Sequence, residues 1–430
     1  MAAFTADLPG SVFADGGRSL MNGVTEPTAS AGDAPVALYV HFPFCISVCP
    51  YCDFVVYAGS AARGPASRVD TTVDALLAEI RLRAPNRPRA LASVYLGGGT
   101  PSLLSAAQVA RLLAAIDGTF GIATGAEVTL EANPAPVDRG DLAGFRAAGV
   151  NRLSIGAQSL DDTELRRLGR RHTATDVVSA VVEARRAGFA NLSVDLLYDV
   201  PGQTLASWQA TLTAALALQP EHLSAYALSL DDPDAEGLTG PNGDHLPLRT
   251  GARRWRQRAA RGQDDGLAAD CYALADELLA QAGRRWYEIS NWSLPRRESR
   301  HNLGYWTGAA WEAVGPGAHA FDGRRTRRWN TARLDLYLAA LADGRLPPGG
   351  RELSDPATAE AERTILRLRT AAGLPRGASE SVPREALAWG RVHGLVERAD
   401  DGRLRLTLRG RLLSNELFVR LLTFDRAAAA

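Results

Sequence analysis

The stretch VALYVHFPFCISVCPYCDF, residues 36–54, joins an apolar run to a loop that holds three of the four cysteines in this 430-residue chain. The run from 36 to 42 is typical of a strand that is buried on both faces. Cys45, Cys49 and Cys52 follow it directly, and three neighbouring thiols cannot all pair off into disulfides. Three thiolates on one loop can hold a 4Fe-4S cluster by three of its irons and leave the fourth iron open to another ligand.

A zinc site is the alternative interpretation of this loop. Structural zinc sites also use closely spaced cysteines, and His41 could complete a set of four ligands. A closed zinc site should show a second ligand pair downstream at a similar spacing, and the sequence contains none. The spacing by itself leaves both metals open.

The apolar run before the cysteines is the first of six that alternate with helix-period segments. The other five are SVYLGG, EVTLEA, RLSIGA, LSVDLLY and HLSAYAL, at residues 93–98, 127–132, 152–157, 192–198 and 222–228. Between them, a capping box of Ser105 and Gln108 opens a predicted helix over 105–117. Parallel strands need crossovers, so six strand-then-helix units predict an α/β fold, a partial parallel (β/α)6 barrel. Functional residues of such barrels gather at the carboxyl ends of the strands.

The sequence divides into four expected parts. Residues 1–35 lack the order of a signal peptide and are expected to form a disordered leader, and the barrel core follows. Residues 231–266 show no apolar period and are predicted to be a loop or insertion, whereas 267–282 are predicted to be a helix with Cys271 as a buried core thiol. The C-terminal part reads helix, helix, two short strands and helix, which predicts a small winged-helix-like module. The predicted parts are 1–35, 36–230, 231–350 and 351–430.

Composition excludes several classes of protein. The chain has 48 basic and 48 acidic residues, so no global field would recruit nucleic acid. No run approaches the roughly 18 apolar residues of a transmembrane helix. Four cysteines, three of them clustered, favour a reducing cytoplasm over a secreted disulfide framework. The arginine-rich stretch 249–261 leaves peripheral contact with the inner face of the membrane as a hypothesis.

The second predicted strand runs into GGGTPSLL, residues 97–104, where consecutive glycines let the backbone approach a ligand closely. Together, YVHFPFCISVCPYCDF and LGGGTPSLL resemble the radical S-adenosylmethionine (SAM) enzymes, specifically the group related to oxygen-independent coproporphyrinogen oxidase. The likeness continues in order through LEANP, NRLSIGAQSLDDTELRRLGRRH, SVDLLYDVPGQT, WYEISNW and SRHNLGYW, between residues 130 and 306.

This resemblance implies a set of cofactor residues. It assigns Cys45, Cys49 and Cys52 to a 4Fe-4S cluster. It also implies that SAM is bound by aromatic rings near the cysteines, by the glycine turn and by polar residues at successive strand ends. These residues are Tyr39, Tyr51, Gly98, Gly99, Thr100, Glu131, Gln158, Arg170 and Asp195. In the family, the cluster donates one electron to SAM and yields a 5′-deoxyadenosyl radical, and the protein positions the reactants and excludes water.

Within the group, the sequence resembles the HemW-type haem chaperones more than the oxidases. The oxidases carry a fourth cysteine two residues after the third, and here that position is Phe54. The resemblance implies haem as cargo and recipient haem proteins as partners, including membrane-bound respiratory enzymes. It also implies that His301, Asn302 and Tyr305 are the candidate haem residues. His319 is a second candidate ligand. True coproporphyrinogen III oxidase activity is the alternative, and the sequence leaves a homodimer open.

The sequence departs from the family pattern in LLYDVPGQ, residues 196–203. Asp199 and Val200 stand where the family usually reads Gly-Leu. A side chain at the glycine position is expected to alter the turn there.

Overall fold

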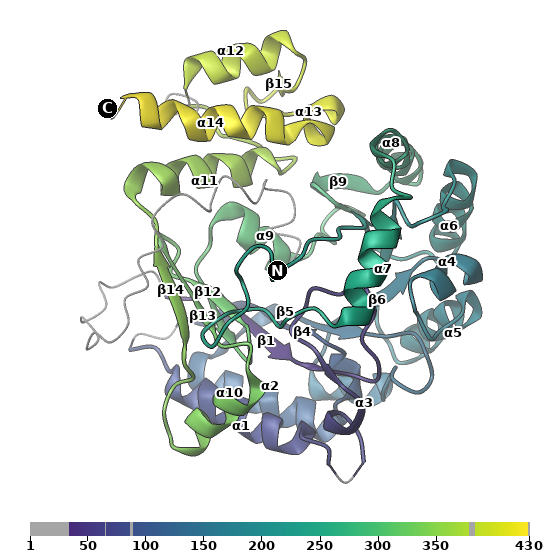
Figure 1. Cartoon of the computed structure of the whole chain (residues 1–430), viewed down its shortest axis with the longest axis vertical. Coiled ribbons are helices and arrows are strands. Elements are labelled where there is room, and N and C mark those ends of the chain that lie inside the picture. The colour runs from purple at the N-terminus through teal and green to yellow at the C-terminus, as the bar shows by residue number, and fades with distance from the viewer. Residues whose placement is uncertain (1–33, 65, 87–88, 378–382, 429–430) are drawn as a thin grey trace.

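A curved sheet forms the centre of the molecule, as the computed structural model in Figure 1 shows. The structure describes residues 34–64, 66–86, 89–377 and 383–428. The expected leader, 1–35, lies almost wholly outside the described residues. Within them, the sheet has 12 strands in the order β14-β13-β12-β11-β1-β4-β5-β6-β7-β8-β10-β9.

The six predicted strands are all present and are neighbours in the sheet. Each pairs in parallel with the next, which confirms the predicted barrel. Their side chains alternate between an apolar set that packs under the helices and a polar set that faces the barrel interior. The six strands are β1 (Ala37–Phe42), β4 (Leu91–Gly98), β5 (Ile122–Ala132), β6 (Arg152–Gln158), β7 (Leu192–Tyr198) and β8 (His222–Ala227).

A seventh parallel strand was not predicted. Strand β11 (Trp311–Val314) pairs in parallel with β1, although more than 260 residues separate the two along the chain. It has only four residues, too few for its periodicity to stand out in the sequence. Antiparallel strands extend the sheet beyond β11 and beyond β8: β12 (His319–Phe321), β13 (Thr326–Asn330), β14 (Gly349–Leu353), β10 (Asn291–Ser293) and β9 (Arg285–Glu288).

Helices cover the outer face of the curved sheet (Figure 1). The predicted capping box of Ser105 and Gln108 opens α2, and the helix buries its predicted stripe of Val109, Leu112, Leu113 and Ile116. The covering helices are α1 (Val69–Leu82), α2 (Ala106–Phe120), α3 (Leu142–Ala148), α4 (Asp162–Arg167), α5 (Ala174–Arg186), α6 (Leu205–Ala217), α8 (Asp265–Gln281) and α10 (Leu334–Ala342). Cys271 on α8 is fully buried in the core, as predicted.

The prediction of a loop over 231–266 was wrong for part of that range. Residues Thr250–Ala260 form the helix α7. Its buried positions are Arg256 and Ala259 rather than an apolar stripe. A helix that is held by a buried arginine carries no hydrophobic period, and this period is the main sequence signal of a helix.

The C-terminal part has the predicted order of elements, except that two helices follow the two strands where one was predicted, and it has its own apolar core around Leu368, Leu387 and Phe418. Arg411 connects it to the barrel: its Nη2 donates to Asp276 Oδ2 on α8 at 2.5 Å, and its guanidinium lies 4.3 Å from the ring centre of Trp286. In Figure 1 this part lies beyond α9 (Arg300–Thr307), at one end of the molecule. Its elements are α11 (Pro356–Leu368), α12 (Arg384–Val392), β15 (Val396–Arg398), β16 (Leu404–Leu406), α13 (Leu408–Leu412) and α14 (Ser414–Ala428).

Candidate functional site

The cysteine loop, residues 45–54, has two differently supported halves. Cys45 ends the short strand β2 (Phe44–Cys45), which pairs with β3 (Tyr57–Ala58). Its Sγ lies 3.1 Å from the Thr100 hydroxyl oxygen. Cys49 and Cys52 lie on a turn that is closed by a 3.1 Å hydrogen bond from the Cys52 amide to the Cys49 carbonyl. The first thiol is therefore held by the β2–β3 pair and by the turn after β4, and the other two lie on a turn outside any strand.

The three thiols lie close enough to influence one another's charge. Burial raises the pKa of Cys45 to about 12, and the nearby Cys49 thiol adds to this rise. Burial also raises the pKa of Cys52 well above its usual range, with contributions from Cys45 and Cys49. All three thiols are unpaired and partly buried, and the raised pKa values of Cys45 and Cys52 mean that these two need a nearby cation to become thiolates.

The donor set fits an iron-sulfur cluster, since thiolates are the ligands that such clusters take. Among the described residues, no three His, Cys, Asp or Glu side chains have the arrangement of a site for one metal ion. The fit therefore rests on the type and proximity of the three thiols.

The glycine turn after β4 lies directly against the start of the cysteine loop. The amides of Gly99 and Thr100 donate to the carbonyls of Phe42 and Phe44, at 2.8 Å each. Gly98 has a φ of +108°, and a Cβ there would lie 2.5 Å from the His41 ring. Only glycine tolerates this backbone and this contact together. The turn thus joins the ends of β1 and β4.

Glu131 lies at the end of β5 beside this turn. Its carboxylate accepts hydrogen bonds from the Tyr95 hydroxyl at 2.9 Å and from the Gly98 amide at 3.0 Å. Burial, partly opposed by the Tyr95 hydrogen bond, raises the pKa of Glu131 to about 7. This carboxyl group is poised to change its charge near neutral pH.

Asp195 on β7 is surrounded by serine hydroxyls from three adjacent strands. Ser154 donates to Oδ2 at 2.7 Å, and Ser193 and Ser224 donate to Oδ1 at 2.8 and 2.7 Å. These contacts hold the carboxylate in one orientation in the barrel interior. Gln158 ends β6 on the same edge of the sheet and has a φ of +64°, a left-handed backbone that is uncommon for residues other than glycine.

Arg170 connects β6 to the cysteine loop. Its Nη2 donates to the Gly156 carbonyl at 2.9 Å and to Asn133 Oδ1 at 2.6 Å, and its Nη1 lies 3.6 Å from Cys49 Sγ. Asn133 in turn donates to the Thr100 hydroxyl at 3.1 Å. Arg170, Asn133 and Thr100 thus form a chain of contacts that reaches both Cys49 and Cys45.

The two tyrosines predicted for the SAM pocket lie in different packing clusters. The Tyr39 hydroxyl lies 3.1 Å from His41 Nδ1, and its ring stacks 6.1 Å from that of Tyr95. Tyr51 packs instead with Leu168 and Val200, and its ring lies 6.4 Å from that of Trp255 on α7. Tyr39 therefore belongs to the barrel interior and Tyr51 to the wall beside α7.

His301 lies in the barrel interior with both ring nitrogens in use. Nδ1 lies 3.0 Å from the Ser93 hydroxyl on β4, and Nε2 lies 2.7 Å from the Tyr305 hydroxyl. Burial lowers the pKa of His301 to about 3. The Asn302 side chain donates to Glu288 Oε1 at 2.9 Å. The three candidate haem residues thus form part of the contacts that hold α9 to the sheet.

The second candidate ligand, His319, lies elsewhere, in a small charged group. Its Nε2 lies 3.0 Å from Asp244 Oδ2, and the other carboxylate oxygen of Asp244 lies 3.0 Å from His245 Nδ1. The hydrogen bonds from the two histidines hold the pKa of Asp244 well below its usual range, against the effect of burial. His319 is partly exposed, in contrast to the buried His301.

The departure from the family pattern at Asp199 leaves a left-handed turn in place. Asp199 has a φ of +59°, and its carboxylate accepts a 3.0 Å hydrogen bond from the Gln263 side chain. Val200 is buried beside Leu168 and Leu228. An aspartate can take this backbone at modest cost, because its short polar side chain forms local hydrogen bonds.

Several residues of the site were missed in the sequence. Asn133 lies within the quoted motif LEANP, and its position just after a strand end was an available signal. The three serines around Asp195 lie at inward positions of predicted strands, where alternation could have indicated them. Arg256 on α7 donates to the backbone of the cysteine loop from more than 200 residues away, and no sequence pattern indicated this contact.

Comparisons with known proteins identify the family. Residues 39–215 match the family model of the radical SAM superfamily. The chain is 37% identical over 382 residues to "Heme chaperone HemW" of Mycobacterium tuberculosis, covering 89% of this chain and 93% of that protein. It is 31% identical to the Haemophilus influenzae protein of the same name, covering 90% of this chain and 98% of that protein.

A solved structure shows the same fold. The coproporphyrinogen III oxidase HemN of Escherichia coli, described as a radical SAM enzyme, aligns with a TM-score of 0.73 at 23% identity, covering 90% of both chains. At this identity the likeness shows the fold alone.

Proposed function

Since this chain belongs to the HemW family of radical SAM proteins, we propose that it is a haem chaperone, which binds haem as cargo and passes it to recipient haem proteins. The observation that carries the proposal is the likeness to proteins of that name along nearly the full length of the chain. The cysteine loop supports it as well. The oxidases carry a fourth cysteine two residues after the third, and in this chain that position is occupied by Phe54, which is 40% exposed.

The family resemblance implies a set of cofactor residues, and their arrangement in the structure supports this proposal. Cys45, Cys49 and Cys52 would hold the 4Fe-4S cluster, and the glycine turn with Glu131, Gln158, Arg170 and Asp195 would bind SAM. When bound and reduced, the cluster supplies one electron for the cleavage of SAM. Glu131 in its ionised form offers a carboxylate to the methionine ammonium group. Arg170 offers its guanidinium to the methionine carboxylate.

For the cargo, we keep His301 as the proposed haem ligand, with Asn302 and Tyr305 as its neighbours. The low pKa of His301 supports this, since a neutral imidazole has a lone pair to give to iron. Its Nε2 is engaged by the Tyr305 hydroxyl at 2.7 Å, so haem binding requires that the hydroxyl move away. Among the described residues, no helix is long and apolar enough to cross a bilayer.

Haem titration of the anaerobically reconstituted protein tests the proposal. We expect saturable binding of haem, followed by visible absorption, that survives Cys45→Ala and weakens in His301→Ala. Transfer of the bound haem to an apo-haemoprotein, measured by the spectrum of the acceptor, then tests delivery. The absence of saturable binding in the wild-type protein would refute the chaperone function.

Two further measurements separate the competing functions. Incubation with coproporphyrinogen III, SAM and a reductant should leave the propionates intact, and vinyl products would instead identify an oxidase. Metal and sulfide analysis of anaerobically purified protein should give iron and sulfide, whereas zinc would overturn the cluster assignment.

A further inference from the structure

We propose that α7, through Arg256, is the positioning element of the second half of the cysteine loop and sets the geometry of Cys49 and Cys52 independently of Cys45. The inference rests on the iron-sulfur site proposed above. It assigns a role to the helix that replaced the predicted loop at Thr250–Ala260.

Arg256 holds the backbone of three consecutive loop residues. Its Nε donates to the Pro50 carbonyl at 3.1 Å, and its Nη2 donates to the carbonyls of Tyr51 at 2.9 Å and Cys52 at 3.1 Å. The same nitrogen forms an ion pair with the Asp53 carboxylate at 2.7 Å. Nη1 donates to the Asp231 carbonyl, which ties the loop to the start of the segment that carries α7. One guanidinium thus contacts every residue from 50 to 53.

The burial of Arg256 makes these contacts costly to lose. The side chain is 4% exposed, so the carbonyls that it satisfies are screened from water. Removal of a buried charged donor leaves its acceptors without partners, and each such loss is unfavourable. Trp255, its neighbour on α7, adds support: its Nε1 donates to the Arg167 carbonyl at 3.1 Å, and its ring lies beside Tyr51.

The first half of the loop has separate supports. Cys45 is held by the β2–β3 pairing and by the Thr100 hydroxyl, and none of these contacts involves α7. Apart from Arg256, the second half has the contact of Arg170 with Cys49 Sγ at 3.6 Å. Loss of Arg256 should therefore loosen Cys49 and Cys52 and leave Cys45 in place.

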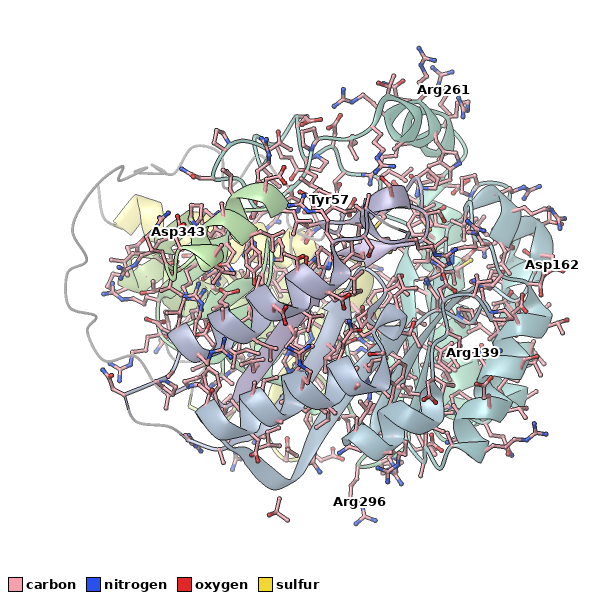
Figure 2. All side chains as sticks on the ribbon, turned by 90° about the horizontal axis from the view of Figure 1, so that it is seen from below. Tyr57, Arg139, Asp162, Arg261, Arg296 and Asp343 are labelled. Carbon is pink, nitrogen blue, oxygen red and sulfur yellow. The ribbon has the colours of Figure 1, made fainter. Side chains whose placement is uncertain are left out.

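The opposite face of α7 provides a matched control. Arg254 lies on the same helix and is exposed, and its side chain forms no hydrogen bond with the described residues of the cysteine loop. Arg261, just after the helix, projects outward from the molecule in Figure 2. Replacement of Arg254 changes the charge of α7 by the same amount as replacement of Arg256 and removes no contact with the loop.

The decisive experiment measures alkylation of each cysteine in the apo-protein by iodoacetamide, with peptide mass spectrometry as the readout. In Arg256→Gln we expect the rates at Cys49 and Cys52 to rise about tenfold, which corresponds to about 1.4 kcal/mol of local opening free energy. The rates at Cys45 and at buried Cys271 should stay within about twofold of wild type. Arg254→Gln should change none of the four.

Equal rates at Cys52 in the wild type and in Arg256→Gln would overturn the inference. A parallel rise at Cys45 and Cys271 would also overturn it, because it would show a general loss of stability. Should Arg256→Gln not fold, Asp53→Asn keeps the arginine and removes its ion pair, and a smaller rise confined to Cys49 and Cys52 is expected. No selective rise in that variant would contradict the inference.

A second readout uses the reconstituted protein. A positive charge beside the cluster favours its reduced form, so the midpoint potential should be more negative in Arg256→Gln than in the wild type. Arg256→Lys keeps the charge and should stay closer to the wild-type potential. Identical potentials in the Gln and Lys variants would contradict an electrostatic role. The labelling test does not depend on cluster assembly, so failure of the cluster proposal and failure of this inference are distinguishable.

Discussion

At the scale of single residues, burial and hydrogen bonding decide whether a ring nitrogen of His301 is available to bind haem iron. The side chain is 2% exposed, and its two ring nitrogens contact Ser93 and Tyr305. These contacts explain how the pattern formed by His301, Asn302 and Tyr305 attaches α9 to the sheet. They also define the change that iron binding requires, because Nε2 cannot hydrogen-bond to Tyr305 and bind iron at the same time.

Replacement of Tyr305 separates a ligand role of His301 from a structural one. Tyr305→Phe frees Nε2, so haem affinity should be retained or increased, whereas His301→Ala should lower it on the order of 10–100-fold. Haem titration of both variants, with thermal unfolding as the control for folding, provides the comparison. A similar loss of affinity in both variants would identify the pattern as structural support alone.

Glu131 makes SAM binding dependent on pH. Its pKa is raised to about 7 by burial, so the carboxyl group is largely neutral below that value. We expect the affinity for SAM to rise with pH up to about 7, by up to about tenfold per pH unit, since the ionised form would bind the methionine ammonium group. Calorimetric titration with SAM between about pH 5.5 and about pH 8 measures this pH dependence of the affinity. Glu131→Gln should flatten the profile, and an unchanged slope in that variant would exclude Glu131 as its cause.

At the scale of elements, one buried carboxylate holds the unpredicted strand β11 in place. Glu79 on α1 is fully buried and accepts hydrogen bonds from Arg83 at 2.9 Å, from the amide of Gly315 at 2.9 Å and from the Asn330 side chain at 2.8 Å. The Tyr337 hydroxyl on α10 donates to it at 2.7 Å. A single side chain thus joins α1 to α10, to β13 and to the turn after β11.

Removal of this carboxylate should strongly destabilise the fold. Glu79→Ala leaves the Arg83 guanidinium without its ion-pair partner and several buried donors without an acceptor. We therefore expect a loss of about 3–5 kcal/mol in the free energy of unfolding. Urea unfolding measures the loss. Asp74→Ala on the same helix is the control: its partner Arg111 is largely exposed, and the change should stay within about 0.5 kcal/mol. Equal stability of the two variants would contradict the role given to Glu79.

At the scale of the whole molecule, several histidines are buried in their neutral form. Burial lowers the pKa of His41 and of His172 to about 4, and it lowers that of His222 well below its usual range. In an unfolded chain, histidine titrates near about 6.5. Between about pH 6.5 and 4 the unfolded state therefore binds more protons than the folded state, and the free energy of unfolding must fall as the pH falls.

The apo-protein should therefore lose stability in mild acid. Each of these histidines contributes a loss of up to about 1.4 kcal/mol per pH unit below about 6.5. Glu131 acts in the opposite direction, because its raised pKa stabilises the fold in acid and this stability is lost as the pH rises through about 7. Burial also raises the pKa of Asp53, Asp138 and Asp199, whose opposing effect begins nearer their usual pKa of about 4, whereas the three histidines act from about pH 6.5. Urea midpoints that fall steadily from neutral pH to about pH 5 are expected, and a constant midpoint would contradict the argument.

The sequence by itself determined the barrel core and the cysteine loop. Six strands, the capping box of α2 and the buried Cys271 follow from periodicity and short motifs, whose cause lies within a few neighbouring residues. The strand order places the glycine turn against the loop, because the ends of adjacent parallel strands meet at one edge of the sheet.

The tertiary structure alone decided β11, α7 and the contacts of His301. Strand β11 pairs with a partner more than 260 residues away, α7 is fixed by a buried arginine that contacts residues 50–53, and His301 on α9 meets Ser93 on β4. Each depends on hydrogen bonds between distant segments. Such bonds leave no periodic trace in the sequence, since burial pairs each polar group with whichever partner the fold brings near.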